Sequence, residues 1–92
     1  MFVLACYDVP AKRTQKYRKI LVQYLMSVQE SVFCGNLTET QYKKLQREIR
    51  NLYEDDDYIT WLTTENRHNV RLEHWQNGEE KRDNKHRGSG VL

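Results

Sequence analysis

The chain has 92 residues, of which 38% are hydrophobic and 30% are charged, so its composition predicts one ordinary soluble globular domain with a polar appendage, and nothing in it suggests a membrane protein. A chain this small buries a modest share of its surface, and we expect it to gain stability by forming a homodimer. The apolar run from Phe2 to Tyr7 has no basic region before it, and Asp8 follows it directly. This pattern excludes a signal peptide and a membrane-spanning helix, and it predicts a cytoplasmic protein.

The net charge of +2 hides a difference between the two halves of the chain. Residues 1–47 carry eight Lys and Arg against three Asp and Glu, whereas residues 48–92 carry seven against ten. Five of the cations lie within eight positions that contain no acid: Lys12, Arg13, Lys16, Arg18 and Lys19. Such a cluster is typical of a surface that binds phosphates, although a solvated helix face would give the same composition.

The run Phe2–Tyr7 predicts a strand that is covered on both faces and lies centrally in its sheet. Pro10 cannot donate a ladder hydrogen bond, so the strand ends near Asp8. After Pro10, apolar residues at helical spacing predict a helix packed on the sheet: Tyr17, Ile20, Leu21, Tyr24 and Leu25. The same spacing predicts that Lys12, Arg13, Lys16 and Lys19 face solvent.

Residues 28–37 indicate extended structure, either one bent strand or a very tight hairpin, with Gly35 at a bulge or bend. Thr38 and Gln41 form a capping-box signature, which predicts a second helix with an apolar face that continues to Tyr53. Four consecutive acids at residues 54–57 are more typical of a solvated loop than of a metal site.

Residues 58–63 and 69–75 predict two further strands, the second of them half exposed as an edge strand. We therefore expect a folded domain over residues 1–75 and a polar tail over 76–92 that is flexible in the isolated protein unless it lies along a neighbouring sheet edge. Val91 and Leu92 would then anchor a partner. Cys6 and Cys34 lack metal-ligand spacing and are interpreted as buried, reduced thiols. The histidines are too scattered for a metal set: His68, His74 and His86.

These elements predict an α+β fold in which two helices cover one face of a largely antiparallel sheet, as in the ferredoxin-like sandwich. The other face of the sheet needs a cover as well. A second copy related by two-fold symmetry would supply it, with the last strand contributing to the contact. The side chains that we expect at that contact are Val70, Leu72 and Trp75.

Several motifs in order resemble the CRISPR-associated Cas-two family over about residues 2–75. They are Tyr7-Asp8-Val9-Pro10, then Arg13, Lys16 and Lys19-Ile20-Leu21, then Val28-Gln29-Glu30-Ser31-Val32-Phe33, and finally Leu37-Thr38-Glu39. The resemblance implies a ferredoxin-like fold and a two-fold dimer that bridges Cas-one integrase dimers during spacer acquisition. It also implies that Asp8 is the residue responsible wherever metal-dependent nuclease activity occurs, with Tyr7 and Phe33 beside it.

Three functions for this chain remain open at the level of sequence. The leading hypothesis is a scaffold that binds the backbone of duplex DNA through the basic cluster and docks the integrase. The second is a magnesium-dependent endonuclease acting on RNA or DNA, in which two Asp8 side chains meet across the dimer axis to hold Mg²⁺. A stacking RNA binder is the third, and no strand carries the closely spaced aromatic residues that it requires. Asp8 also has a purely structural alternative, in which its carboxylate caps the loop before the first helix.

Overall fold

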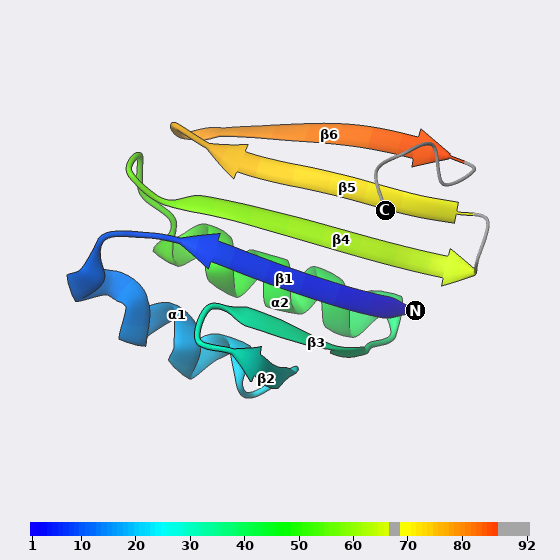
Figure 1. Cartoon of the computed structure of the whole chain (residues 1–92), viewed down its shortest axis with the longest axis horizontal. Coiled ribbons are helices and arrows are strands. Elements are labelled where there is room, and N and C mark those ends of the chain that lie inside the picture. Colours follow the sequence, from blue (N-terminus) through cyan, green and yellow to red (C-terminus); the bar gives the residue numbers. More distant parts are fainter. Residues whose placement is uncertain (67–68, 87–92) are drawn as a thin grey trace.

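The computed structural model describes residues 1–66 and 69–86, with the last strand described through its backbone. In chain order the elements are β1 (Phe2–Asp8), η1 (Ala11–Arg13), α1 (Thr14–Leu21), β2 (Met26–Gln29), β3 (Val32–Asn36), α2 (Glu39–Leu52), β4 (Tyr58–Asn66), β5 (Asn69–Gln76) and β6 (Glu79–His86) (Figure 1). The strands of the described chain form one antiparallel sheet in the order β2-β3-β1-β4-β5-β6. β1 therefore lies inside the sheet, as its apolar sequence predicted.

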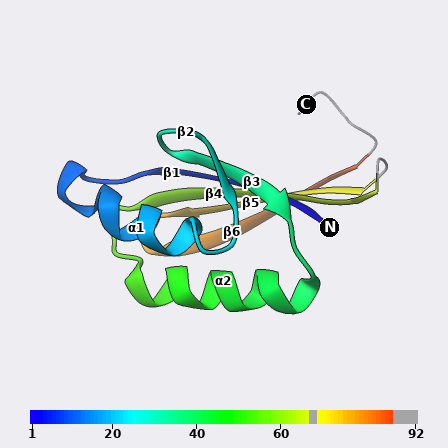
Figure 2. The ribbon, with the colours of Figure 1, turned by 90° about the horizontal axis from the view of Figure 1, so that it is seen from below.

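Both helices cover the same face of the sheet (Figure 2). The predicted α+β, ferredoxin-like arrangement is confirmed as a β1-α1-β2-β3-α2-β4 frame, to which β5 and β6 add a hairpin. Among the described residues, no helix combines the length and the apolar character needed to cross a membrane.

The core lies between the helices and the sheet. In β1, Val3, Ala5 and Tyr7 are buried toward the helices, and they alternate with residues that point to the other face. The rest of the buried layer consists of Tyr17, Leu21, Leu25, Phe33, Leu37, Leu45, Ile49, Ile59, Trp61 and Trp75. We call the other side the open face, because neither helix covers it. Its half-buried apolar side chains include Phe2, Leu4, Cys6, Val32, Cys34, Leu62, Val70 and Leu72.

α1 ends at Leu21, one turn earlier than the predicted apolar stripe. The backbone N–H groups of Tyr24 and Leu25 donate to the carbonyl of Leu21 in a turn, and this turn still buries the Leu25 side chain. Residues 26–36 then form the tight hairpin rather than a bent strand. Gly35 lies at a close approach, since an added Cβ would stand 3.3 Å from Leu25 Cδ2, and the irregular pairing falls instead between Ser27 and Gln29.

The start of α2 matches its sequence signature. The backbone N–H of Gln41 donates to Thr38 Oγ1 at 3.1 Å, and the backbone N–H of Thr38 donates to Gln41 Oε1 at 2.8 Å. These reciprocal bonds satisfy two N–H groups that a helix start otherwise leaves without partners. The predicted capping box is confirmed.

The prediction of a flexible tail from residue 76 is wrong for residues 79–86, which form β6 and pair with β5 along its length. Asn77 and Gly78 adopt positive φ angles of 56° and 77°, the conformation of a two-residue hairpin turn, so they reverse the chain. As a result β5 lies inside the sheet, and the edge strands are β2 and β6. Val91 and Leu92 lie outside the described residues.

Candidate nucleic-acid interface and the Asp8 site

Asp8 is the last residue of β1 and its side chain is exposed. It forms no side-chain hydrogen bond with another residue in the part of the chain that the structure describes, and η1 begins after Pro10 without a side-chain cap. The capping role considered for Asp8 is therefore wrong. Its carboxylate stands free at the point where β1 meets the loops before β4 and after β5.

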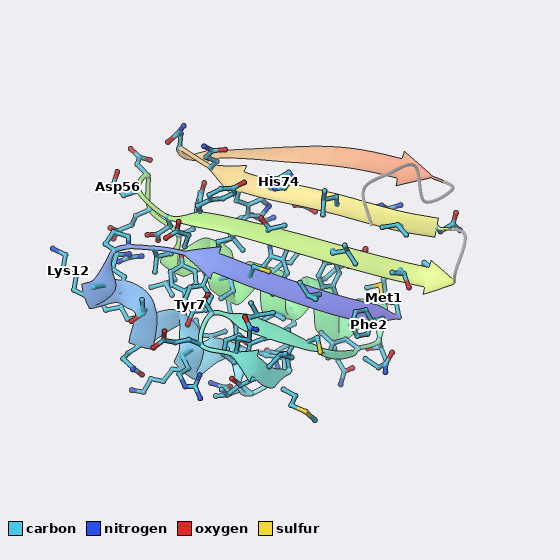
Figure 3. The ribbon with its side chains drawn as sticks, in the orientation of Figure 1. Met1, Phe2, Tyr7, Lys12, Asp56 and His74 are labelled. Carbon is cyan, nitrogen blue, oxygen red and sulfur yellow. The ribbon has the colours of Figure 1, made fainter. Side chains whose placement is uncertain are left out.

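Two open clefts flank Asp8. The first has a volume of about 350 Å³, and its lining includes Asp55, Asp56, Gln76 and Asn77. The second, of about 380 Å³, lies on the side of α1 and is lined by Tyr7, Arg18 and Glu30 among others. Figure 3 shows Lys12 and Asp56 at the same end of the molecule, pointing outward from the two loops that frame this site.

The acids around Asp8 do not form a metal centre within one chain. In the described residues, no three His, Cys, Asp or Glu side chains lie close enough together to hold a metal ion. Magnesium needs near-octahedral oxygen ligands, usually one or two carboxylates with substrate oxygens and water. Asp55 and Asp56 line the same cleft as Asp8, but the described side chains form no three-ligand cluster there. The side chains of His68 and His86 lie outside this description.

Tyr7 and Phe33, the residues expected beside Asp8, are both core residues, and Tyr7 also lines the second cleft. Their rings stack at 6.2 Å, and Tyr7 also stacks on Tyr17 at 5.3 Å. The Arg18 guanidinium lies over the Phe33 ring at 5.7 Å, and its Nη1 donates to Ser27 Oγ at 3.5 Å. Burial raises the pKa of the Tyr7 hydroxyl, while the nearby charge of Arg18 opposes this rise. The cation at position 18 is thus held half-buried at the edge of the cleft.

The basic cluster divides into exposed and buried members. Lys12, Lys16 and Lys19 are exposed, and we call them the α1 basic surface. None of them forms an ion pair with another described residue. Arg13 is buried, so the prediction that it faces solvent is wrong, and its guanidinium is unavailable to a phosphate.

Arg13 is bound instead by Asp57, the last of the four consecutive acids. Arg13 Nε and Nη2 donate to the Asp57 carboxylate at 2.8–3.2 Å, Nη2 also donates to the Leu52 carbonyl, and Nη1 lies 3.3 Å from Glu54 Oε2. The Tyr17 hydroxyl donates to Asp57 at 2.6 Å. Asp57 is 1% exposed, so the expected solvated loop is wrong for its last residue. The network joins the start of α1 to the loop between α2 and β4.

The ionisation of Asp57 follows from these contacts. Burial by itself would raise the pKa of this carboxyl. Hydrogen bonds from Arg13, from Tyr17 and from the backbone N–H of Glu54, together with the Arg13 charge, outweigh burial and lower the pKa below its usual value. The same pairing raises the pKa of the Arg13 guanidinium, and burial together with the bond to Asp57 raises that of Tyr17. Asp57 and Arg13 therefore both remain charged at neutral pH.

A sequence signal for this network was present and was missed. Arg13, Tyr17 and Leu21 lie at i, i+4 and i+8, so Arg13 continues the apolar stripe that packs on the sheet. A cation in phase with buried residues requires a buried acid as its partner. Asp57, directly before an apolar strand, was the available candidate.

Of the side chains expected at a partner interface, Val70 and Leu72 lie half-buried on the open face. Trp75 does not. It is fully buried on the helix side, where its ring packs against Tyr53 and Trp61. Its place in the interface was wrongly predicted, because Trp75 is out of phase with Val70 and Leu72 along β5.

Comparisons with known proteins agree with this fold. The family model described as CRISPR associated protein Cas2 matches residues 1–71. The chain belongs to the Cas2 family. Two similar proteins are each called CRISPR-associated endoribonuclease Cas2: one from Haloferax volcanii, 44% identical over 68 residues that cover 74% of this chain and 79% of the relative, and one from Methanosarcina acetivorans, 34% identical over 74 residues that cover 79% and 85%.

The crystal structure of Streptococcus pyogenes Cas2 at pH 6.5 has a similar fold, with a TM-score of 0.64 and 27% identity. The alignment covers 70% of this chain and 86% of that one. The Cas2 match ends at residue 71, inside β5, so it includes Asp8 and the basic cluster while β6 lies beyond it. The Cas2 frame therefore contains both features of the candidate site.

Proposed function

We propose that the protein is a dimeric, nucleic-acid-binding scaffold of CRISPR spacer acquisition that holds duplex DNA and bridges subunits of the Cas-one integrase. The observation that carries this proposal is the α1 basic surface. Lys12, Lys16 and Lys19 are exposed on one helical segment, residues 11–21, that contains no acid. Cations without protein partners suit the phosphates of a duplex, whose sequence they would not distinguish.

The dimer in this proposal is supported by the open face. Its apolar side chains form a band across β1, β4 and β5, and a second copy would remove that band from water. Because a dimer that works with the integrase on DNA would act in the cytoplasm, we expect it there. The free thiols of Cys6 and Cys34 would stay reduced in that compartment.

The test of the scaffold is a reconstituted integration reaction with the integrase of the same system and duplex DNA. We expect Lys16→Ala together with Lys19→Ala to reduce DNA affinity and to flatten its dependence on salt by about 0.9 per lost phosphate contact. Asp8→Asn should leave integration nearly unchanged. Loss of integration by Asp8→Asn, with dimer, DNA binding and integrase docking intact, would contradict the scaffold role.

A second candidate function is a magnesium-dependent endonuclease, which is favoured by the name endoribonuclease that the similar Cas2 proteins carry. Asp8 from two protomers would be the metal ligands, and the metal would supply Lewis-acid activation of the phosphodiester. In that case Asp8→Asn abolishes magnesium-dependent cleavage of RNA or DNA and leaves the dimer intact. Cleavage that persists in Asp8→Asn would exclude this candidate.

A further inference from the structure

The outer side of α2 carries a second group of cations that neither the fold nor the α1 basic surface explains. Lys43, Lys44 and Arg47 are exposed, on the side of the helix opposite the buried Leu45 and Ile49. We call these three cations the α2 basic surface. Lys43 and Arg47 are four residues apart, so about 6 Å of helix axis separates them along one row.

The charges on α2 repel one another. Arg47 has Lys43 at i−4, Lys44 at i−3 and Arg50 at i+3, and like charges at these spacings destabilise a helix. The α2 basic surface forms no ion pair with any other residue in the ranges 1–66 and 69–86. A bound anion would relieve this repulsion.

α2 carries two acids, Glu39 at i−4 of Lys43 and Glu48 at i+4 of Lys44, and in the described chain neither forms an ion pair with these lysines. Glu39 lies in the first turn, where the helix dipole favours a negative charge. The Glu48 carboxylate accepts a hydrogen bond from the Tyr24 hydroxyl, which joins α2 to the turn after α1. This bond raises the pKa of the Tyr24 hydroxyl, and the charge of Arg47 opposes the rise. Arg47 therefore lies near the contact between α2 and the turn after α1. The two basic surfaces therefore belong to neighbouring helices in one layer (Figure 2).

The composition of this surface fits phosphates better than a protein partner. Protein interfaces are depleted in lysine and place apolar or aromatic residues at their centre. The exposed positions of α2 are polar or charged throughout, with one acid among them: Glu39, Thr40, Gln41, Lys43, Lys44, Arg47, Arg50 and Asn51. Nucleic-acid backbones are held by rows of Lys and Arg of this kind.

We propose that the α2 basic surface binds the backbone of duplex DNA, so that each protomer holds DNA through two helices rather than one. This inference rests on the proposed function, because it assigns a second contact to the same ligand. The second contact widens the area that a duplex covers on the helix layer. It predicts no preference among base sequences, because the contacts are to phosphates.

The experiment measures binding of a short labelled duplex by fluorescence anisotropy from about 50 to 200 mM salt. The test protein is the full chain with Lys43→Gln, Lys44→Gln and Arg47→Gln, and the slope of log affinity against log salt should become shallower by about two to three. A variant with Lys43→Arg and Lys44→Arg keeps the charge and should retain the slope. Arg47→Gln is compared with Arg71→Gln, a control at an exposed arginine of β5, because each substitution removes one positive charge. Arg47→Gln should weaken binding and Arg71→Gln should not.

The fold of the triple variant is checked by thermal unfolding, and its melting temperature should stay level or rise, because repulsion within α2 is removed. Unchanged affinity and slope in the triple variant, with binding lost in Lys16→Ala and Lys19→Ala, would overturn this inference and leave the proposed function standing. No loss in either variant would overturn both. If the triple variant keeps its DNA affinity and loses the integrase, the surface binds an acidic protein and the inference is wrong.

Discussion

Arg13 and Lys12 are adjacent in the sequence, yet the Arg13 guanidinium is buried against Asp57 while the Lys12 side chain is exposed. Arg13 begins the stripe that packs on the sheet, so its charge must be neutralised inside the protein. Asp57 does this with help from Tyr17 and the Glu54 backbone. The Arg13–Asp57 pair joins η1, which follows Asp8 in the sequence, to the loop that lines the first cleft.

Asp57→Asn should destabilise the fold by about 3 kcal/mol, because it leaves the Arg13 charge buried without its full partner. The free energy of unfolding is measured by urea titration. Asp56→Asn is the matched control, since Asp56 is an exposed acid in the same loop, and its effect should stay within about 0.5 kcal/mol. Equal urea midpoints for Asp57→Asn and Asp56→Asn would show that the Arg13–Asp57 pair adds nothing to stability.

The Asp57 pair should also make stability depend on pH at the acidic end. The folded protein lowers the pKa of Asp57, so in this range the unfolded chain binds more protons and stability rises with pH. The contribution is complete above the usual carboxyl pKa of about 4 and is lost as pH falls below it through the folded-state value. The difference in unfolding free energy between the wild type and Asp57→Asn should therefore narrow on acidification below pH about 4. A constant difference would contradict this.

Whole helices and strands were easier to predict than their end points or the edge strands of the sheet. The strand from Phe2, both amphipathic helices and the Thr38 capping box were all visible as periodicity or local hydrogen-bonding chemistry. β6 was missed because its residues, Glu79 to His86, show no apolar alternation. Its signal was the Asn77-Gly78 pair, which follows the alternating residues of β5 and is a favoured pair for a two-residue hairpin turn. The candidate site showed the same division. The place of Asp8 at the end of β1 and the exposure of Lys12, Lys16 and Lys19 followed from the sequence, whereas the partner of Arg13 required the fold.

Gly78→Ala should destabilise the hairpin of β5 and β6 by about 1–2 kcal/mol. Gly78 has a φ of 77°, and an added Cβ would lie 2.8 Å from Asp55 Oδ1. The backbone N–H of Gly78 also donates to the Tyr53 hydroxyl at 3.2 Å, which ties the turn to the end of α2. Thermal unfolding measures the effect. Asn77→Gly, which fits the positive φ, should have no such cost, and an equal loss in both would contradict the explanation.

For the whole molecule, the open face determines whether the protein is a monomer or a dimer. Leu4, Leu62 and Leu72 are directly paired across β1, β4 and β5, so they form a short apolar row at the centre of this face. Helices protect only the other side. The predicted homodimer would cover the row by packing two open faces together.

Leu62→Glu should convert the dimer into a monomer, because the new carboxylate would have to be buried without a partner. Sedimentation velocity at concentrations well above micromolar measures the change. Val22→Glu is the control, since Val22 is 47% exposed in the turn after α1, and it should remain dimeric. A wild-type monomer at these concentrations would show that the open face is stable in water.

The central place of β1 has a consequence for how the chain is made. β1 is synthesised before both of its neighbours, and about fifty residues separate its end from the start of β4. At about 5–20 residues per second, the ribosome needs roughly 3–10 s to produce them. β3 is made earlier within this interval, so until β4 emerges it is the β4 edge of the apolar strand β1 that lacks its native partner. Pro10, Lys12 and Arg13 follow this strand directly. A proline and charges beside an apolar segment discourage pairing between nascent chains, so we expect the residues behind Asp8 to keep β1 from aggregating until β4 emerges.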